Sequence, residues 1–120
     1  INKMKLKQKT IAYLRVSTEQ QLNSQKLELH EYAHKNKLKI NEFIEAEISS
    51  KKNLAQRKID SLLDKLQKGD LLLVSELSRL GGSTGQVIQI IDSLIKNGVR
   101  FVAVKESIRV DGKQDRLVRK

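Results

Sequence analysis

The 120-residue sequence contains no cysteine, proline or tryptophan, and aromatic residues make up only 3% of it. The absence of cysteine excludes a disulfide framework and a cysteine-based zinc site, and it favours a reducing, cytoplasmic setting. Without proline, glycine is the only strong breaker of helices and strands. No apolar run is long enough for a membrane span, and no segment resembles a signal peptide. We therefore expect one domain with an aliphatic core.

Acidic residues are scarce relative to basic ones, since 24 Lys and Arg face 14 Asp and Glu and give a net charge of +10. Such an excess on a small domain predicts a polyanionic partner, and nucleic acid is the commonest one. The lysines are spread along the chain, so a solvated lysine coat is the alternative for most of them. The segment 109–120 is denser in arginine and lysine, which favours contact with DNA or RNA there.

Apolar segments alternate with amphipathic ones along the chain, which predicts the order β-α-β-α-β-α-β. The predicted strands are residues 10–16, 38–47, 71–74 and 99–104, and the predicted helices are residues 17–37, 54–67 and 83–96. Strands that alternate with helices form a mainly parallel sheet covered on both faces. We predict an α/β fold with a four- to five-stranded sheet over residues 10–110, a flexible lead-in at 1–9 and a basic tail at 111–120.

Polar side chains gather where the predicted parallel strands end, at one edge of the sheet. The end of the first strand carries Tyr13, Arg15 and Ser17; the second is followed by Glu45, Glu47, Ser49 and Arg57, and the third by Ser78 and Arg79. A serine hydroxyl beside guanidinium groups at a helix N-terminus is suited to chemistry on a phosphate ester, because both the guanidiniums and the helix start attract phosphate. Clustered guanidinium groups would also activate the hydroxyl.

These residues have structural interpretations as well. Ser17 or Thr18 can be the N-cap of the first helix, since Ser17 with Gln20 and Thr18 with Gln21 both match a capping box. Arg15 can pair with Glu45 or Glu47 at the strand ends. Tyr13 can belong to the core with its hydroxyl at the rim, and Arg57 and Arg79 can be surface charges.

Other kinds of site fit the sequence less well. His30 and His34 lie one helical turn apart without a third ligand nearby, so we expect surface histidines rather than a metal site. A magnesium site at Glu45 and Glu47 is disfavoured by the basic surroundings. A receiver-like domain needs an acidic cluster where Arg15 stands, and no Gly-Lys-Ser phosphate loop is present.

The segment Tyr13-Leu14-Arg15-Val16-Ser17-Thr18, followed by Gln21, resembles the opening motif of the serine recombinases, the resolvase/invertase family. Two further blocks of that family follow in the same order, Ile48-Ser49-Ser50 with Arg57 and then Leu77-Ser78-Arg79-Leu80-Gly81. Three motifs in the correct order over residues 10–115 are far more specific than any one of them.

The resemblance implies the catalytic domain of a site-specific DNA recombinase. It implies that Ser17 attacks a DNA phosphodiester to form a 5′-phosphoserine link, while arginines bind the phosphate and polar neighbours support them. The residues expected in these two roles are Arg15, Arg57 and Arg79, and Gln21 and Ser49. Contacts to double-stranded DNA are expected from Tyr13, Ser78, Arg116, Arg119 and Lys120. The family needs no metal or other cofactor, and its members form homodimers that assemble into tetramers.

The third block departs from the family pattern in two places. Gly82 stands where the family has a phosphate-binding arginine, and Ser78 stands where many relatives have aspartate. The missing cation predicts weak or no cleavage by this chain. It also keeps open the alternative of a catalytically impaired DNA-binding or dimerisation module with the same fold. The basic tail is expected to begin the dimerisation helix.

Overall fold

A computed structural model describes residues 8–47 and 52–110 of the chain. The strands are β1 (Thr10–Val16), β2 (Glu42–Glu47), β3 (Leu71–Val74), β4 (Arg100–Ala103) and β5 (Ile108–Val110). The helices are α1 (Glu19–Lys35), α2 (Lys52–Lys65) and α3 (Thr84–Lys96), and a short 3₁₀ helix, η2 (Leu77–Arg79), follows β3. The predicted alternation of strands and helices is confirmed.

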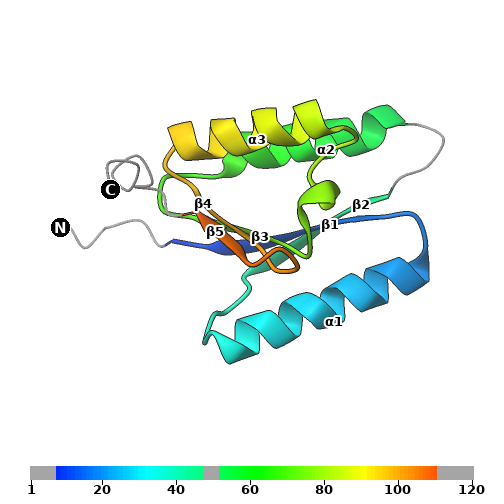
Figure 1. The fold of residues 1–120 in the computed structure, drawn as a ribbon, viewed down its shortest axis with the longest axis vertical. Coiled ribbons are helices and arrows are strands. Elements are labelled where there is room, and N and C mark those ends of the chain that lie inside the picture. Colours follow the sequence, from blue (N-terminus) through cyan, green and yellow to red (C-terminus); the bar gives the residue numbers. More distant parts are fainter. Residues whose placement is uncertain (1–7, 48–51, 111–120) are drawn as a thin grey trace.

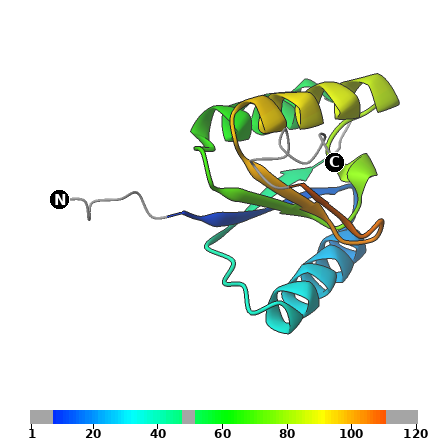
Figure 2. The ribbon, with the colours of Figure 1, turned by 60° about the vertical axis from the view of Figure 1, so that its left-hand side comes forward.

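The five strands form one sheet in the order β2-β1-β3-β4-β5, in which β1 to β4 are parallel and β5 is antiparallel to β4. The helix α1 covers one face of this sheet, and α2 and α3 lie side by side on the other (Figures 1 and 2). The predicted fold class, a mainly parallel sheet with helices on both faces, is therefore confirmed.

The strand β1, second in the strand order, contributes to two apolar cores on opposite faces of the sheet. Its alternate residues Ile11 and Tyr13 pack toward α2 and α3, whereas Ala12 and Leu14 pack toward α1. All four are fully buried, as expected for a parallel strand covered on both faces. Alternation along β1 thus decides which side chains can reach each layer of helices.

The second strand is shorter than predicted, because residues 38–41 do not join the sheet and β2 begins at Glu42. The preceding helix ends in a Schellman turn: Lys37 has a positive φ of 55°, and the backbone N–H of Leu38 donates to the carbonyl of Ala33 at 2.8 Å. Lysine rarely adopts this conformation, so the sequence gives little sign of the turn. The segment then passes through Asn41, which exchanges hydrogen bonds with Thr10.

Two further predictions need correction. The second helix spans Lys52–Lys65 rather than 54–67, and Gly69, with φ of 92°, lies in the turn that enters β3. The strand β5 follows a turn at Val104–Ser107 and was not among the four strands located in the sequence. A three-residue strand that follows a serine with positive φ (Ser107, 58°) is too short to detect from sequence alternation.

Some sequence predictions lie outside the described residues. These are most of the lead-in (residues 1–7), Ser49, and the tail with Arg116, Arg119 and Lys120. The structure describes Lys9 at the end of the predicted lead-in, and this residue is tied to the domain. Its N–H donates to Oδ1 of Asp70 at 3.0 Å, and its carbonyl accepts from the N–H of Leu71 at 2.8 Å.

Candidate active site at the carboxyl edge of the sheet

The strand order reverses direction between β1 and β3. The chain passes from β1 to β2 on one side and then crosses to β3 on the other side, so the carboxyl ends of β1 and β3 flank a topological switch point. Ser17 follows β1, and the 3₁₀ helix η2 with Arg79 follows β3. Figure 1 shows this edge at the end of the molecule where α1 and α3 begin. In an open α/β sheet, this is where a ligand is expected to bind.

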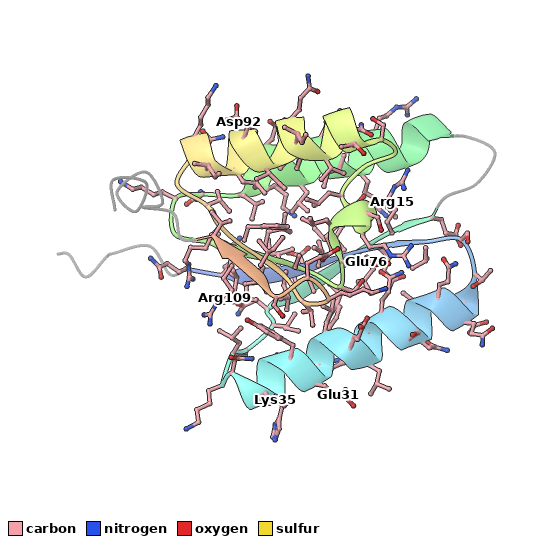
Figure 3. All side chains as sticks on the ribbon, in the orientation of Figure 1. Arg15, Glu31, Lys35, Glu76, Asp92 and Arg109 are labelled. Atoms are coloured by element: carbon pink, nitrogen blue, oxygen red, sulfur yellow. The ribbon has the colours of Figure 1, made fainter. Side chains whose placement is uncertain are left out.

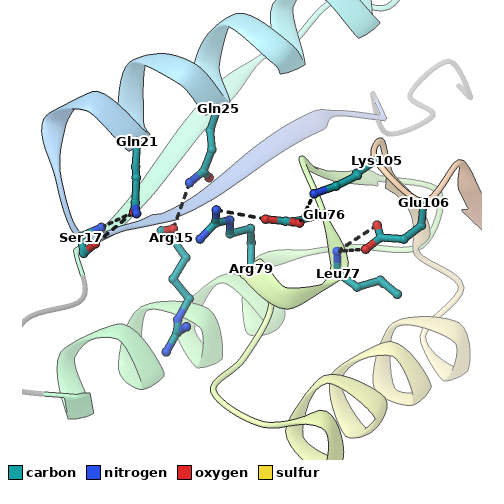
Figure 4. A network of polar contacts seen from close by, with 9 residues as sticks. All are labelled: Arg15, Ser17, Gln21, Gln25, Glu76, Leu77, Arg79, Lys105 and Glu106. Atoms are coloured by element: carbon teal, nitrogen blue, oxygen red, sulfur yellow. Dashed lines mark hydrogen bonds and ion pairs between the residues drawn. The ribbon is translucent and has the colours of Figure 1, made fainter.

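Thr18, and not Ser17, is the N-cap of α1. Its hydroxyl oxygen accepts a hydrogen bond from the backbone N–H of Gln21 at 3.1 Å. Ser17 is exposed, and both its N–H and its hydroxyl donate to Oε1 of Gln21, at 2.8 and 3.1 Å (Figure 4). The structure thus decides between the two capping alternatives and leaves the Ser17 oxygen at the surface with lone pairs available.

Arg15 projects from the face of β1 that is covered by α2 and α3. Within the described residues, no ion pair joins it to Glu45 or Glu47, and Glu45 pairs instead with Lys26 of α1 at 3.2 Å. The register explains this result, because Arg15 lies beside Ala46 and therefore on the opposite face from both glutamates. The structural interpretation of Arg15 as a strand-end ion pair is wrong.

The guanidinium of Arg15 lies next to Gly82. A Cβ atom added to Gly82 would stand 3.7 Å from Nη2 of Arg15 and 3.6 Å from Oε1 of Gln86, which are ordinary contact distances. The backbone end of Arg15 is also fixed, since Nε2 of Gln25 donates to its carbonyl oxygen at 3.1 Å. A side chain at position 82 would therefore start next to the Arg15 guanidinium.

Arg79 of η2 reaches the same edge from the β3 side. Its Nη2 forms an ion pair with Oε2 of Glu76 at 3.0 Å, and its Nε is buried with no hydrogen-bond acceptor in the described part of the chain. Arg79 lines a pocket of about 520 Å³ together with Thr18 and Gln21 from α1. The pocket thus joins the β3 side of the switch point to the helix start beside Ser17. Among the described residues, no hydrogen bond joins Ser17 to Arg15 or Arg79 (Figure 4).

Tyr13 belongs to the core, with its side chain fully buried. Its hydroxyl has no hydrogen-bond partner among the described residues. Burial raises its pKa to about 12, the Arg15 guanidinium opposes this rise, and the Asp60 carboxylate adds to it. A fully buried hydroxyl cannot reach DNA, so the structure contradicts the prediction of Tyr13 as a DNA contact. The core position of Tyr13 is confirmed, but its hydroxyl is buried and does not lie at the rim.

The remaining predicted residues are more dispersed. Arg57 on α2 and Ser78 on η2 are exposed, and His30 and His34 are exposed on α1. No group of three or more His, Asp or Glu among residues 8–47 and 57–110 is placed to hold a metal ion. No helix in the same part of the chain is long and apolar enough to cross a membrane.

Four residues at this edge were missed in the sequence: Gln25, Glu76, Lys105 and Glu106. Gln25 is 3% exposed, and it precedes the buried residues Leu29 and Ala33 at helical spacing, so its inward position could have been found from periodicity. The other three gave no comparable signal, because charged residues near turns usually face solvent. Figure 3 shows Glu76 near η2, whereas Glu31 and Lys35 project from the outer side of α1.

The chain matches the family described as "Resolvase, N terminal domain" over residues 10–120. The protein therefore belongs to the resolvase N-terminal domain family, and the resemblance seen in the three sequence blocks is confirmed.

Named relatives and solved structures agree with this assignment. The chain is 33% identical over 108 residues to the protein named "Probable DNA-invertase y4cG" of Sinorhizobium fredii, covering 90% of this chain and 33% of the relative. It is 34% identical over 98 residues to a resolvase of Clostridium perfringens, covering 81% of this chain and 49% of the relative. The chain thus spans between a third and a half of the length of these curated relatives. The N-terminal catalytic domain of TP901-1 integrase superposes with a TM-score of 0.67 at 25% identity, over 93% of this chain and 89% of that one.

Proposed function

We propose that this chain is the catalytic domain of a site-specific DNA recombinase that cleaves and rejoins double-stranded DNA through Ser17. Membership of the resolvase family supports this function, as do the net charge of +10 and the position of Ser17 at the switch point of the sheet. The protein acts in the cytoplasm in this proposal. We propose further that the protein pairs into homodimers that assemble into tetramers.

The proposed reaction exchanges one phosphate ester for another. The Ser17 oxygen attacks a backbone phosphorus and loses its proton, a P–O bond forms, and the bond from phosphorus to the 3′-oxygen breaks. The 3′-oxygen leaves as a hydroxyl after it takes up a proton, and the 5′-phosphate stays on Ser17. Rejoining reverses these steps with a 3′-hydroxyl as the nucleophile. Because the ester to Ser17 replaces the ester to DNA, no external energy source is needed.

In this mechanism guanidinium groups stabilise the negative charge that develops on the phosphate. Arg15 belongs to β1, Arg79 to η2 and Arg57 to α2, and in this proposal all three guanidinium groups bind the phosphate. Gln21 orients the Ser17 hydroxyl through the hydrogen bond at 3.1 Å, and Ser49 is proposed to assist. Ser78 and the basic tail with Arg116, Arg119 and Lys120 contribute DNA contacts.

One observation carries the proposal: Thr18 caps α1, so Ser17 is not needed for the helix. A serine at a helix start is most often a cap. Here that role is filled by the neighbouring threonine, and the Ser17 hydroxyl is exposed and held by the Gln21 side chain. A DNA phosphate can therefore approach Ser17 without disrupting α1.

A second candidate function is a catalytically impaired DNA-binding or dimerisation module of the same fold. Gly82 favours it, because the position next to Arg15 where the family carries an arginine holds no side chain. The ion pair between Arg79 and Glu76 also reduces the positive charge available at the site.

The two candidates are separated by a test for a covalent protein–DNA adduct. Duplex DNA with a randomised central region is labelled at either the 3′ or the 5′ end of one strand and incubated with the protein. In a denaturing gel, a 5′-phosphoserine link carries the 3′-labelled segment with the protein and leaves the 5′-labelled segment unattached. We expect the 3′-labelled adduct at low yield, and its complete loss in Ser17→Ala.

Thr18→Ala provides the matched control for this experiment. Loss of the cap should lower the free energy of unfolding by about 1 kcal/mol, while adduct formation persists at a temperature where the variant is folded. Ser17→Ala should unfold like the original protein in urea. Absence of any adduct from the original chain would support the impaired module, and an adduct that survives Ser17→Ala would refute the assignment of Ser17.

A further inference from the structure

Glu76 and Arg79 form the most buried ion pair among the described residues, with the two side chains only 23% and 25% exposed. The ion pair between Lys96 and Asp92 on α3, by comparison, has side chains that are 73% and 62% exposed. Solvent screens an exposed pair strongly and a buried pair much less. The Glu76 carboxylate therefore has a larger influence on where the Arg79 guanidinium lies than a surface pair would.

The Glu76 carboxylate is available for Arg79 because it does not cap η2. Glu76 precedes η2 in an extended conformation (φ −158°, ψ 159°), but its side chain makes no capping hydrogen bond. The backbone N–H of Leu77, the first of η2, donates instead to the carboxylate of Glu106, at 3.2 and 3.3 Å from its two oxygens. A residue 29 positions later in the chain thus replaces the usual local cap.

The turn between β4 and β5 holds this arrangement in place. The backbone N–H of Lys105 donates to the carbonyl of Ser75 at 2.8 Å, and its Nζ lies 3.5 Å from Oε1 of Glu76. Together with the contact from Glu106 to Leu77, these bonds tie the turn to the chain on both sides of Glu76. Figure 4 shows Lys105 and Arg79 in contact with Glu76, and Glu106 in contact with the neighbouring Leu77.

Glu76 uses only part of the hydrogen-bonding capacity of Arg79. The ion pair engages Nη2, whereas the buried Nε has no acceptor among the described residues. A guanidinium has five N–H donors in a fixed fork, so binding on one edge leaves the others directed away from Glu76. Arg79 also lines the pocket that it shares with Thr18 and Gln21. The carboxylate thus fixes the guanidinium beside the start of α1 and leaves donors for an anion.

We propose that Glu76 is a positioning residue that orients Arg79 toward the DNA phosphate, and that Lys105 and Glu106 hold Glu76 in that position. This inference rests on the proposed function, because it assigns Arg79 to the phosphate. It gives the β4–β5 turn a role in strand cleavage although the turn contributes no group to the phosphate itself.

The first test follows Arg79 directly and does not require cleavage. Nuclear magnetic resonance of the Arg79 Nε–Hε group is compared between the original chain and Glu76→Gln, with and without duplex DNA. We expect Glu76→Gln to shift this resonance, to accelerate its exchange with water, and to reduce its response to DNA. Asp92→Asn is the matched control, because it removes the same charge from an exposed ion pair and should leave the Arg79 resonance unchanged. Identical Arg79 behaviour in the original chain and Glu76→Gln overturns the proposal.

The second test measures the rate of adduct formation at saturating DNA. We expect Glu76→Gln to lower this rate on the order of 10- to 100-fold, the scale of a misplaced catalytic group, without weakening DNA binding. Glu76→Asp should recover part of the rate, and Glu76→Gln should have little further effect in an Arg79→Ala background. An unchanged or faster rate in Glu76→Gln refutes a positioning role. The role is also refuted if Glu76→Gln lowers the rate by the same factor in the original chain and in the Arg79→Ala background. If the original chain forms no adduct, the proposed function fails, and the resonance experiment alone decides the role of Glu76.

Discussion

The side-chain oxygen of Gln21 accepts two hydrogen bonds from Ser17, one from the backbone N–H at 2.8 Å and one from the hydroxyl at 3.1 Å. The first bond fixes the backbone at the end of β1, and the second sets the direction of the hydroxyl proton. A carboxamide oxygen is too weak a base to remove that proton, so Gln21 can orient the nucleophile but cannot activate it. Activation is left to positive groups around the oxygen.

Gln21→Ala should therefore slow adduct formation without abolishing it. Loss of one hydrogen bond of ordinary strength, about 1 kcal/mol, corresponds to a rate about five- to tenfold lower. The rate is measured at saturating DNA, and Gln20→Ala, on an exposed neighbouring position of α1, is the control. A loss as large as that of Ser17→Ala would mean that Gln21 takes part in proton transfer.

The same hydrogen-bond arrangement occurs at the start of α3. Ser83 caps that helix by accepting from the N–H of Gln86 at 3.2 Å, and Oε1 of Gln86 accepts from the N–H of Gly82 at 2.6 Å. In both helices the glutamine reaches the residue before the cap, rather than the cap itself as in a standard capping box. Gly82 thus occupies at α3 the place that Ser17 occupies at α1, and both residues lie at the same edge of the sheet.

The buried Tyr13 hydroxyl predicts a specific change of stability with pH. In the folded protein its pKa is about 12, against an ordinary value of 10.0, so the folded state holds the proton more tightly than the unfolded state. Between these two pH values the unfolded state binds fewer protons, and the free energy of unfolding falls as the pH rises. Two units of pKa correspond to about 2 to 3 kcal/mol.

Tyr13→Phe should remove this contribution. The free energy of unfolding of both proteins is measured by urea denaturation at neutral pH and at increasing alkaline pH. The difference between the two proteins reports on Tyr13 alone, because all other titrating groups are shared. The two curves should separate above pH 10, with the original chain losing more stability. At neutral pH the variant should be as stable or about 1 kcal/mol more stable, because it buries no unpaired hydroxyl. Parallel curves would show that the hydroxyl is hydrated or paired in solution.

Much of the fold could be predicted because its elements carry strong local patterns. The fully buried strand β3 is a continuous aliphatic run, and α3 ends at Asn97 and Gly98 as expected for a Schellman turn. The elements that were misplaced depend on unusual local geometry. Lys37 and Ser107 adopt positive φ values without being glycine, and they determine where β2 and β5 begin.

The candidate site was predictable in its location and less so in its contacts. The position of Ser17 and Arg79 follows from parallel strands that end at one edge, which a sequence can indicate. Whether Ser17 or Thr18 caps α1 could not be predicted, because Ser17 with Gln20 and Thr18 with Gln21 match the same capping pattern. The pairing of Arg79 with Glu76, and the support from Lys105, depend on a turn between β4 and β5 that no sequence pattern indicated.

The final prediction concerns Gly82, where the chain lacks the family's arginine. A side chain has room there, since an added Cβ meets Gln86 and Arg15 only at 3.6 and 3.7 Å, and the backbone of Gly82 has no positive φ. The variant Gly82→Arg should therefore fold, and it retains the backbone N–H that donates to Gln86.

Gly82→Arg should also raise the rate of adduct formation. Removal of one donor that stabilises transition-state charge typically costs about 100-fold or more, so restoring a guanidinium should recover a substantial part of that factor. Gly82→Gln, of similar length but neutral, separates the effect of charge from that of a larger side chain and should change the rate little. If Gly82→Arg folds, binds DNA and still cleaves no faster, the defect lies elsewhere. The impaired module would then be the better account of this chain, because the charge deficit beside Arg15 would not be what limits it.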